Sequence, residues 1–149
     1  FKKINKEYFN NKLKINSMMI EQRYGIEIPE NKFINKVYSQ GFHFDKERLD
    51  MVRFFISLED LNKSSGGTDL INYHDTKKIV RKNFFKMNFL KPTRLYNDLI
   101  AEKDKNITIH KFEGEKGCAV FFNPNIIFHR GNIPKPGLTR TILSFTFGL

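Results

Sequence analysis

Two residues able to bind a metal ion lie two positions apart in the stretch GFHFD. His43 and Asp45 are separated by Phe44, and Phe42 precedes them. Residues i and i+2 of a β-strand point to the same face, so a strand here projects the imidazole and the carboxylate together. The two phenylalanines then point to the opposite face, where they can be buried. Such a pair offers one nitrogen and one oxygen to a single ion, although so short a motif also occurs by chance.

A second histidine and an arginine in the C-terminal part strengthen the metal interpretation. His129 ends the apolar run 125–129 (NIIFH), and Arg140 lies near the start of the next predicted strand, after a loop rich in glycine and proline. If this loop returns the chain antiparallel, the two residues lie near the same end of a sheet. Two histidines and one carboxylate with open positions form the facial triad of non-haem Fe(II) oxygenases. An arginine in a barrel mouth needs an anion, and a carboxylate satisfies it through a bidentate fork.

The alternative interpretation of these residues is structural. In that interpretation the two histidines are simply hydrogen-bonded, Asp45 is a solvated turn carboxylate, and Arg140 is a surface arginine on an edge strand. The metal interpretation is favoured because Arg140 and the segment 57–67 (SLEDLNKSSGG) accompany the histidines and the carboxylate. His74 and His110 are interpreted as structural, the first hydrogen-bonded in the loop after its strand and the second facing solvent. Residues 64–68 (SSGGT) lack the lysine and the helix of a phosphate-binding loop and predict a β-turn.

The elements that position these residues are mostly short strands. The apolar spacing predicts one helix over 4–24, ended by Gly25, and a second helix over 76–90. Residues 26–35 are expected to be a connection. Strands are expected where aromatic and β-branched residues dominate, at 36–44, 51–58, 69–74, 106–112, 117–122, 125–129 and 139–147. Short strands separated by turns predict an all-β sandwich or barrel, and a cupin-like jelly roll is the natural candidate.

Length and composition fit one domain over residues 1–149. The chain is 40% hydrophobic and has 16 phenylalanines, which is enough for a packed core. The net charge of +10 indicates either an anionic partner or a compositional excess of lysine. We favour the second, because net charge bears on association rather than fold. The segment 77–94 has basic side chains and no acid; a solvated helix face is favoured over a lid for an anionic substrate.

The lone cysteine, Cys118, rules out an internal disulfide and fits a reducing cytoplasm. We expect it to be a small core residue. No apolar run approaches the roughly 18 residues of a transmembrane helix, and no signal peptide is visible. The sequence therefore predicts a cytoplasmic protein without a membrane partner.

The chain resembles the phytanoyl-CoA dioxygenase-like branch of the Fe(II)/2-oxoglutarate-dependent oxygenases. The resemblance runs from about residue 36 to the C-terminus. It rests on GFHFD, on the segment 54–74, and on 117–131 (GCAVFFNPNIIFHRG) followed by Arg140. It implies a double-stranded β-helix, which is a jelly roll, here with an N-terminal helix and a helical insertion. By resemblance, iron is held by the catalytic residues His43, Asp45 and His129. Arg140 binds the far carboxylate of 2-oxoglutarate, and Phe55 forms a wall of that pocket.

The activity that the resemblance implies is O₂-dependent hydroxylation of a small molecule, with release of succinate and CO₂. Asp45 argues against halogenation, because halogenating relatives carry a small residue there. The chain departs from the family at Phe42, at Gly66-Gly67 and at 72–74 (NYH), where other residues are usual. Family members also carry a longer N-terminal region, and only 42 residues precede His43, so we expect the chain to lack part of it.

Two functions of other classes stay open. The first is a jelly-roll binding module that kept the fold and lost the chemistry, which binds a ligand without releasing succinate. The second is a basic nucleic-acid-binding domain, which predicts steep salt dependence and aromatic side chains exposed among the lysines. Most of the phenylalanines lie in strand patterns, which favours their burial and disfavours the nucleic-acid interpretation.

Overall fold

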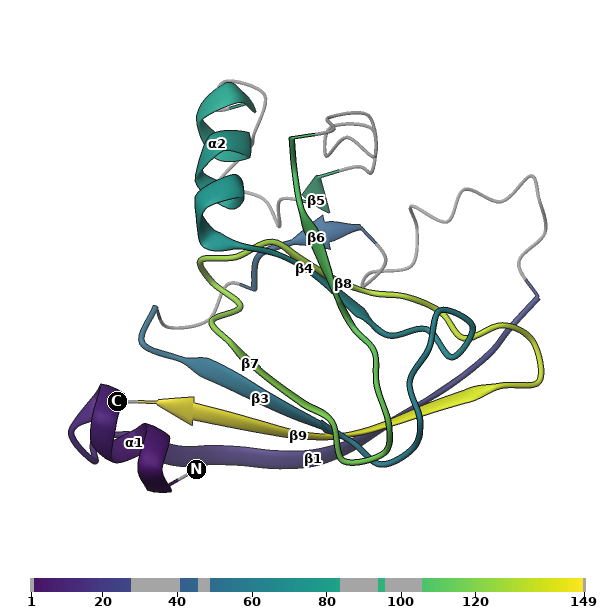
Figure 1. Cartoon of the computed structure of the whole chain (residues 1–149), viewed down its shortest axis with the longest axis horizontal. Helices are drawn as coiled ribbons and strands as arrows, with labels where there is room; N and C mark the ends of the chain where they lie inside the picture. The colour runs from purple at the N-terminus through teal and green to yellow at the C-terminus, as the bar shows by residue number, and fades with distance from the viewer. Residues whose placement is uncertain (1, 28–40, 46–48, 84–93, 96–105, 149) are drawn as a thin grey trace.

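Two antiparallel β-sheets face each other in the computed structural model, which describes residues 2–27, 41–45, 49–83, 94–95 and 106–148 (Figure 1). The major sheet has the strand order β1 (Lys14–Tyr24), β9 (Thr139–Gly148), β3 (Val52–Ser57) and β7 (Ala119–Phe122). The minor sheet has the order β5 (Arg94–Leu95), β2 (Phe42–His43), β8 (His129–Gly131), β4 (Thr68–Ile71) and β6 (Ile109–Phe112). The helices are α1 (Lys2–Phe9) and α2 (Tyr73–Asn83). This architecture confirms the predicted mainly β, jelly-roll fold with an N-terminal helix and a helical insertion.

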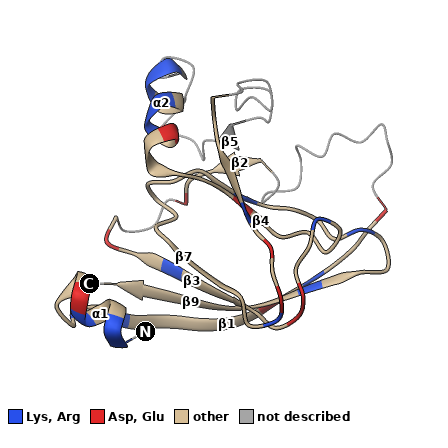
Figure 2. Cartoon of the chain, in the orientation of Figure 1, with Lys and Arg blue, Asp and Glu red and all other residues tan. Residues whose placement is uncertain are grey.

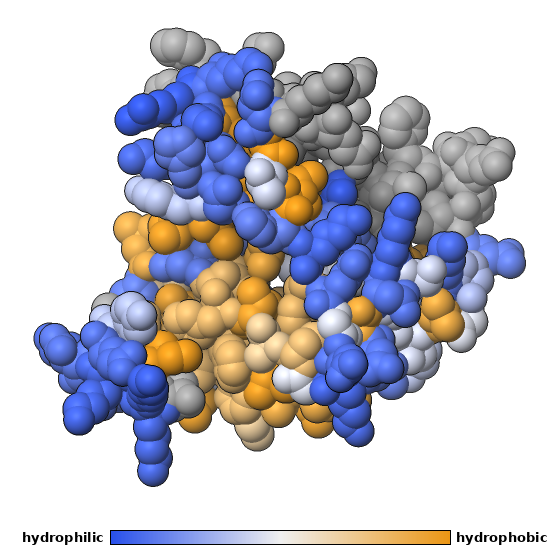
Figure 3. Space-filling view, in the orientation of Figure 1, coloured by the Kyte–Doolittle hydropathy of each residue, from blue (hydrophilic) through white to orange (hydrophobic). Residues whose placement is uncertain are grey.

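The apolar side chains form three buried clusters, one between the sheets and two outside them. The cluster between the sheets contains Phe55, Leu61, Leu70, Phe112, Phe122 and Ile142. On the outer face of the major sheet, Phe147 packs with Val52, Leu13 and Phe9 of α1. On the outer face of the minor sheet, Ile79 of α2 packs with Phe42 and Phe128. Figure 3 shows apolar side chains gathered over the strands of the major sheet.

The prediction of a single helix over residues 4–24 is wrong in its extent. α1 ends at Phe9, and Asn10 and Asn11 follow with φ angles of 48° and 60°, the left-handed conformation that asparagine tolerates. The chain then pairs with β9 as the edge strand β1. Met18 and Met19 point to opposite faces of β1, yet both side chains are exposed, at 65% and 49%. Because neither face is buried, the strand lacks the alternation that would have identified it.

The predicted strand over 125–129 is also wrong. The side chain of Asn123 accepts a hydrogen bond from the Asn125 N–H at 2.9 Å and so starts a turn. β8 begins only at His129, so this histidine starts a strand rather than ending one.

The remaining predicted elements occur near their expected positions. The structure has strands within or overlapping 51–58, 69–74, 106–112, 117–122 and 139–147, and a turn within 62–68. The predicted strand 36–44 is described only from residue 41, and the predicted helix 76–90 only to residue 83. α2 starts three residues early because Asn72 caps it, accepting from the Asp75 N–H at 2.8 Å. His74 is therefore an exposed residue of the first helical turn and not a loop residue.

The basic residues of α2 within 77–94 are all exposed, namely Lys77, Lys78, Arg81 and Lys82. Figure 2 shows how basic residues colour much of this helix. This arrangement fits a solvated helix face, and residues 84–93 lie outside the described part. Among the residues that the structure describes, no helix has the length and apolar character needed to cross a membrane.

Candidate metal centre

The structure brings the three predicted metal ligands together between the two sheets. His43 of β2 and His129 of β8 are direct partners in the minor sheet. Asp45 follows β2, and its N–H donates to the Pro124 carbonyl at 3.0 Å. Asp45 Oδ1 lies 3.6 Å from His43 Nε2 and 3.5 Å from His129 Nε2. One ligand atom from each residue lies within 4.8 Å of the other two.

Backbone contacts fix which imidazole nitrogens face the centre. His43 Nδ1 lies 2.8 Å from the Gly41 carbonyl oxygen, and His129 Nδ1 lies 3.3 Å from the Ile127 carbonyl oxygen. Because a carbonyl oxygen only accepts hydrogen bonds, each Nδ1 is assigned the proton. In the neutral imidazoles, each Nε2 then presents a lone pair toward Asp45. A hydrogen bond on the remote nitrogen is also what orients metal-ligating histidines.

Three acceptor atoms facing one another form an arrangement that a cation stabilises. Both Nε2–Oδ1 separations exceed the 2.7–2.9 Å typical of a charge-assisted hydrogen bond. An ion about 2.1 Å from each ligand spaces neighbouring ligand atoms roughly 3 to 3.4 Å apart, according to the bond angle. The residues present therefore fit a metal ion after a small adjustment. The donor set of two nitrogens and one carboxylate oxygen suits non-haem Fe(II).

The second carboxylate oxygen of Asp45 is held by Arg53, a residue of β3 that the sequence analysis missed. Arg53 Nη2 lies 2.7 Å from Asp45 Oδ2, as a close ion pair rather than an aligned hydrogen bond. Burial by itself would raise the pKa of Asp45, but interactions with His129, Arg53 and His43 outweigh it and lower that pKa below its usual value. The carboxylate is therefore ionised at neutral pH and presents Oδ1 to the centre.

Aromatic side chains lie on both faces of the minor sheet, and those of the inner face lie beside the centre. The Phe122 ring lies 5.3 Å from the His129 ring and 5.2 Å from the ring of Phe55. Phe55 therefore reaches the centre through Phe122, which the sequence analysis did not single out. Phe42 and Phe44 point to the opposite face as predicted; Phe42 is fully buried and Phe44 stacks on Phe128 at 4.0 Å.

Arg140 is buried inside the fold, with an exposed fraction of 4%. Its guanidinium lies over Gly131, since Nη2 would be 3.3 Å from a Cβ placed on that residue. Gly131 follows His129 by two residues on the same face of β8, a spacing of about 7 Å along a strand. Burial and then the charge of Arg23 lower the pKa of Arg140 to about 10, with Glu21 acting in the opposite direction. Arg140 still carries its charge at neutral pH.

The glycine pair 66–67 supplies a contact for this arginine. The Gly66 carbonyl accepts a hydrogen bond from Arg140 Nη1. Gly66 has φ of 75°, and a Cβ there would lie 2.6 Å from the Pro134 nitrogen. Only glycine combines this backbone conformation with so close an approach. The predicted β-turn thus also holds Arg140 through its backbone.

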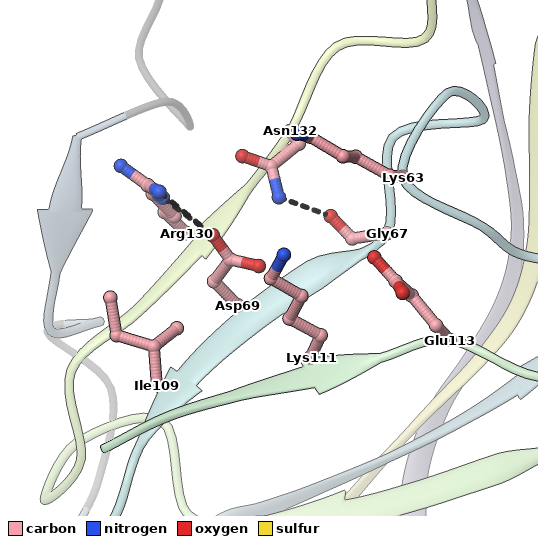
Figure 4. Close-up of a pocket in the computed structure, with 8 residues that line it drawn as sticks. All are labelled: Lys63, Gly67, Asp69, Ile109, Lys111, Glu113, Arg130 and Asn132. Carbon is pink, nitrogen blue, oxygen red and sulfur yellow. Dashed lines mark hydrogen bonds and ion pairs between the residues drawn. The ribbon is translucent and has the colours of Figure 1, made fainter.

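The remaining candidate residues lie apart from the centre. His110 is exposed, as expected. Cys118 packs against the cluster between the sheets, and burial followed by the charge of Asp60 raises the pKa of its thiol. A hollow of about 440 Å³ lies on the outer face of the minor sheet, lined by Asp69, Lys111 and Arg130 among others (Figure 4). Arg130 and His129 are consecutive in β8, so they point to opposite faces.

Comparison with known proteins identifies similar solved structures but no similar sequences. No protein-family model and no curated protein matches the chain. The iron-bound structure of HygX from Streptomyces hygroscopicus has a TM-score of 0.56 at 10% identity, over 96% of this chain and 61% of HygX. SnoK, a non-haem α-ketoglutarate-dependent carbocyclase from nogalamycin biosynthesis, has a TM-score of 0.55 at 12% identity, over 91% of this chain.

A third similar structure is SnoN, a non-haem α-ketoglutarate-dependent epimerase from the same biosynthesis. It has a TM-score of 0.54 at 9% identity, over 91% of this chain. The chain spans about half the length of these proteins, 46% of SnoN and 50% of SnoK. At such low identity the likeness establishes the fold alone. It gives no support to the phytanoyl-CoA dioxygenase-like branch over other non-haem enzymes of this fold.

Proposed function

We propose that the protein is an Fe(II)/2-oxoglutarate-dependent oxygenase with His43, Asp45 and His129 as its iron ligands. The observation that carries this proposal is the position of Arg140 relative to the three ligand atoms. Three convergent acceptor atoms lie next to a buried arginine, whose guanidinium sits over Gly131, two residues along β8 from His129. In this proposal a five-carbon dicarboxylate binds with one end at the metal and the other at the arginine.

Each residue has a defined task in this proposal. His43 and His129 bind the ion through neutral Nε2 atoms, and Asp45 binds through Oδ1 while Arg53 holds Oδ2. Arg140 pairs with the far carboxylate of the co-substrate, and Phe55 and Phe122 keep water from the centre. When bound, iron and 2-oxoglutarate would supply the activation of O₂, with release of succinate and CO₂. SnoN and SnoK, described as α-ketoglutarate-dependent, support this choice of co-substrate.

The finer proposal is a dioxygenase that hydroxylates a small molecule, as the resemblance to the phytanoyl-CoA dioxygenase-like branch implies. Asp45 occupies the position that a halogenating enzyme leaves open for halide. The solved structures of similar fold include an epimerase and a carbocyclase. The competing activity is therefore C–H oxidation that leads to epimerisation or ring closure instead of hydroxylation. A hydroxylated product that contains an atom of labelled O₂ distinguishes hydroxylation from both.

Arg140 separates 2-oxoglutarate chemistry from other His and Asp metal sites. A zinc hydrolase or an inert binding module needs no cation there, whereas a carboxylate entering a partly dry pocket must be paired. Removing one partner of a buried charge pair costs about 2 to 5 kcal/mol, which is roughly 30- to several-thousand-fold in affinity. We expect Arg140→Met to show this loss in calorimetry with 2-oxoglutarate on oxygen-free, iron-loaded protein.

Arg140→Lys provides the graded comparison, because ammonium keeps the charge but loses the bidentate fork. Its affinity for 2-oxoglutarate should lie between those of wild type and Arg140→Met, and iron affinity should stay nearly unchanged in both variants. An Arg140→Met protein that binds 2-oxoglutarate as tightly as wild type would remove the co-substrate assignment. Binding of 2-oxoglutarate without any release of succinate would favour the inactive binding module instead.

A further inference from the structure

A second arginine shares the pocket of Arg140. Arg23 of β1 and Arg140 of β9 are direct partners in the major sheet, so their side chains leave the sheet on the same face. Both guanidinium groups reach the space over Gly131. A Cβ placed on that glycine would lie 3.3 Å from Arg140 Nη2 and 3.5 Å from Arg23 Nη1. The absence of a side chain at position 131 is what leaves room for both groups.

Glu21 is close enough to raise the pKa of Arg140, but no carboxylate of the described residues pairs directly with this arginine. Its hydrogen-bond acceptors are backbone carbonyls, that of Gly66 and, at 3.5 Å, that of Asn132. Among the residues that the structure describes, Arg140 forms no ion pair. Like charges directly opposite on neighbouring strands destabilise a sheet. The proximity of Arg23 is also the second largest cause, after burial, of the lowered pKa of Arg140. An anion bound between the two guanidinium groups removes this repulsion.

We propose that Arg23 is a second carboxylate-binding residue, which together with Arg140 holds the far carboxylate of the dicarboxylate co-substrate. This inference rests on the proposed function and adds to it a residue from the edge strand. Each guanidinium presents a planar fork of donors, and a carboxylate has two oxygens with about four acceptor sites, so one carboxylate can satisfy both arginines. Because Arg23 is only partly buried, its contact is more screened by water than that of Arg140.

The test compares Arg23→Gln with wild type and with Lys14→Gln. Lys14 lies at the other end of β1 and is exposed, so its replacement removes the same charge from the same strand away from the pocket. The measurement is calorimetry with 2-oxoglutarate on oxygen-free, iron-loaded protein. We expect a loss of about 10- to 150-fold in Arg23→Gln, the range for hydrogen bonds to charged groups, and no change in Lys14→Gln.

Two further measurements separate a direct contact from a structural effect. The first is binding of 2-oxopentanoate, which has the same chain length but lacks the far carboxylate; Arg23→Gln should bind it as wild type does. The second is the far-ultraviolet circular dichroism of the ligand-free protein, in which Arg23→Gln should match wild type. Arg23→Lys should recover part of the 2-oxoglutarate affinity.

The outcomes distinguish this inference from the proposed function. If Arg23→Gln binds 2-oxoglutarate as wild type does while Arg140→Met does not, the role of Arg23 is wrong and the co-substrate assignment stands. An equal loss of 2-oxopentanoate and 2-oxoglutarate in Arg23→Gln also overturns the role, because the effect is then not on the far carboxylate. Failure of the wild-type protein to bind 2-oxoglutarate overturns both proposals.

Discussion

Replacing Arg53 tests whether the orientation of Asp45 is needed for metal binding. Arg53 Nη2 lies 2.7 Å from Asp45 Oδ2, and the two side chains are 24% and 16% exposed. Without this contact the carboxylate is free to turn about its broad terminal torsion, and Oδ1 is no longer held toward the histidines. We take the loss of orientation as about 1.5 to 3 kcal/mol, the range for contacts to charged groups. That is roughly 10- to 150-fold in iron affinity.

An electrostatic effect opposes the loss of orientation, so the direction in which iron affinity changes is informative. The guanidinium of Arg53 is positive and repels a divalent cation, so its removal also favours iron binding. We expect orientation to dominate, because partners that orient metal ligands typically contribute 10- to 100-fold to metal affinity. The assay is oxygen-free competition for Fe(II) against a chromophoric chelator, on wild type and Arg53→Met. Equal or tighter binding of iron by Arg53→Met would refute the positioning role.

Arg130→Met is the matched control for this experiment. Arg130 pairs with Asp69 through Nη2 at 2.8 Å, and it follows His129 directly in β8. Its side chain lies on the outer face of the minor sheet, beside the hollow in Figure 4. The control thus removes a comparable charge pair next to a proposed ligand without touching the centre. It should lower the melting temperature but leave iron affinity within about twofold, a change of less than about 0.5 kcal/mol.

Further predictions concern the ligands and their protonation. Replacing His43 or His129 with alanine should abolish iron-dependent release of succinate while the far-ultraviolet circular dichroism stays native; two variants with full iron affinity would contradict the ligand assignment. The lowered pKa of Asp45 means that its ionised form is lost only when pH falls below the usual carboxyl range, so Asp45 stays ionised between pH 7 and 5. Iron affinity should nevertheless weaken below about pH 6.5, where free imidazole protonates, because both histidines must bind as neutral ligands. An affinity that is flat from pH 7 to pH 5 would exclude histidine ligation.

The grouping of the proposed metal ligands was predictable in part, because the signal at His43 and Asp45 is local. His43 and Asp45 are two residues apart, and the alternation of a strand is enough to place them on one face. The prediction for His129 placed it correctly at a strand end but at the wrong end, because the apolar run before it forms a turn started by Asn123. The burial of Phe128 comes from packing with Ile79 of α2 and not from strand pairing.

The two additional arginines were missed because their roles depend on contacts between distant elements. Arg53 contacts Asp45 only because β3 and β2 belong to sheets that face each other. Its signal was the one charged residue in the largely apolar run 51–58, two residues before Phe55 and on the same face. Arg23 lay within the wrongly predicted helix 4–24, and its position opposite Arg140 follows from the register of β1 with β9. Edge strands with both faces exposed carry little sequence information about register.

The central claim is that iron and 2-oxoglutarate bind at one site between His43, Asp45, His129 and Arg140. The most direct measurement is the visible absorption spectrum of oxygen-free protein titrated with Fe(II), with 2-oxoglutarate, and with both. We predict a weak metal-to-ligand charge-transfer band only when both are present, with its amplitude saturating at one iron per chain. The band should be lost in His129→Ala and should need more 2-oxoglutarate in Arg140→Met. Tight binding of both components to the wild-type protein without this band would contradict a shared site.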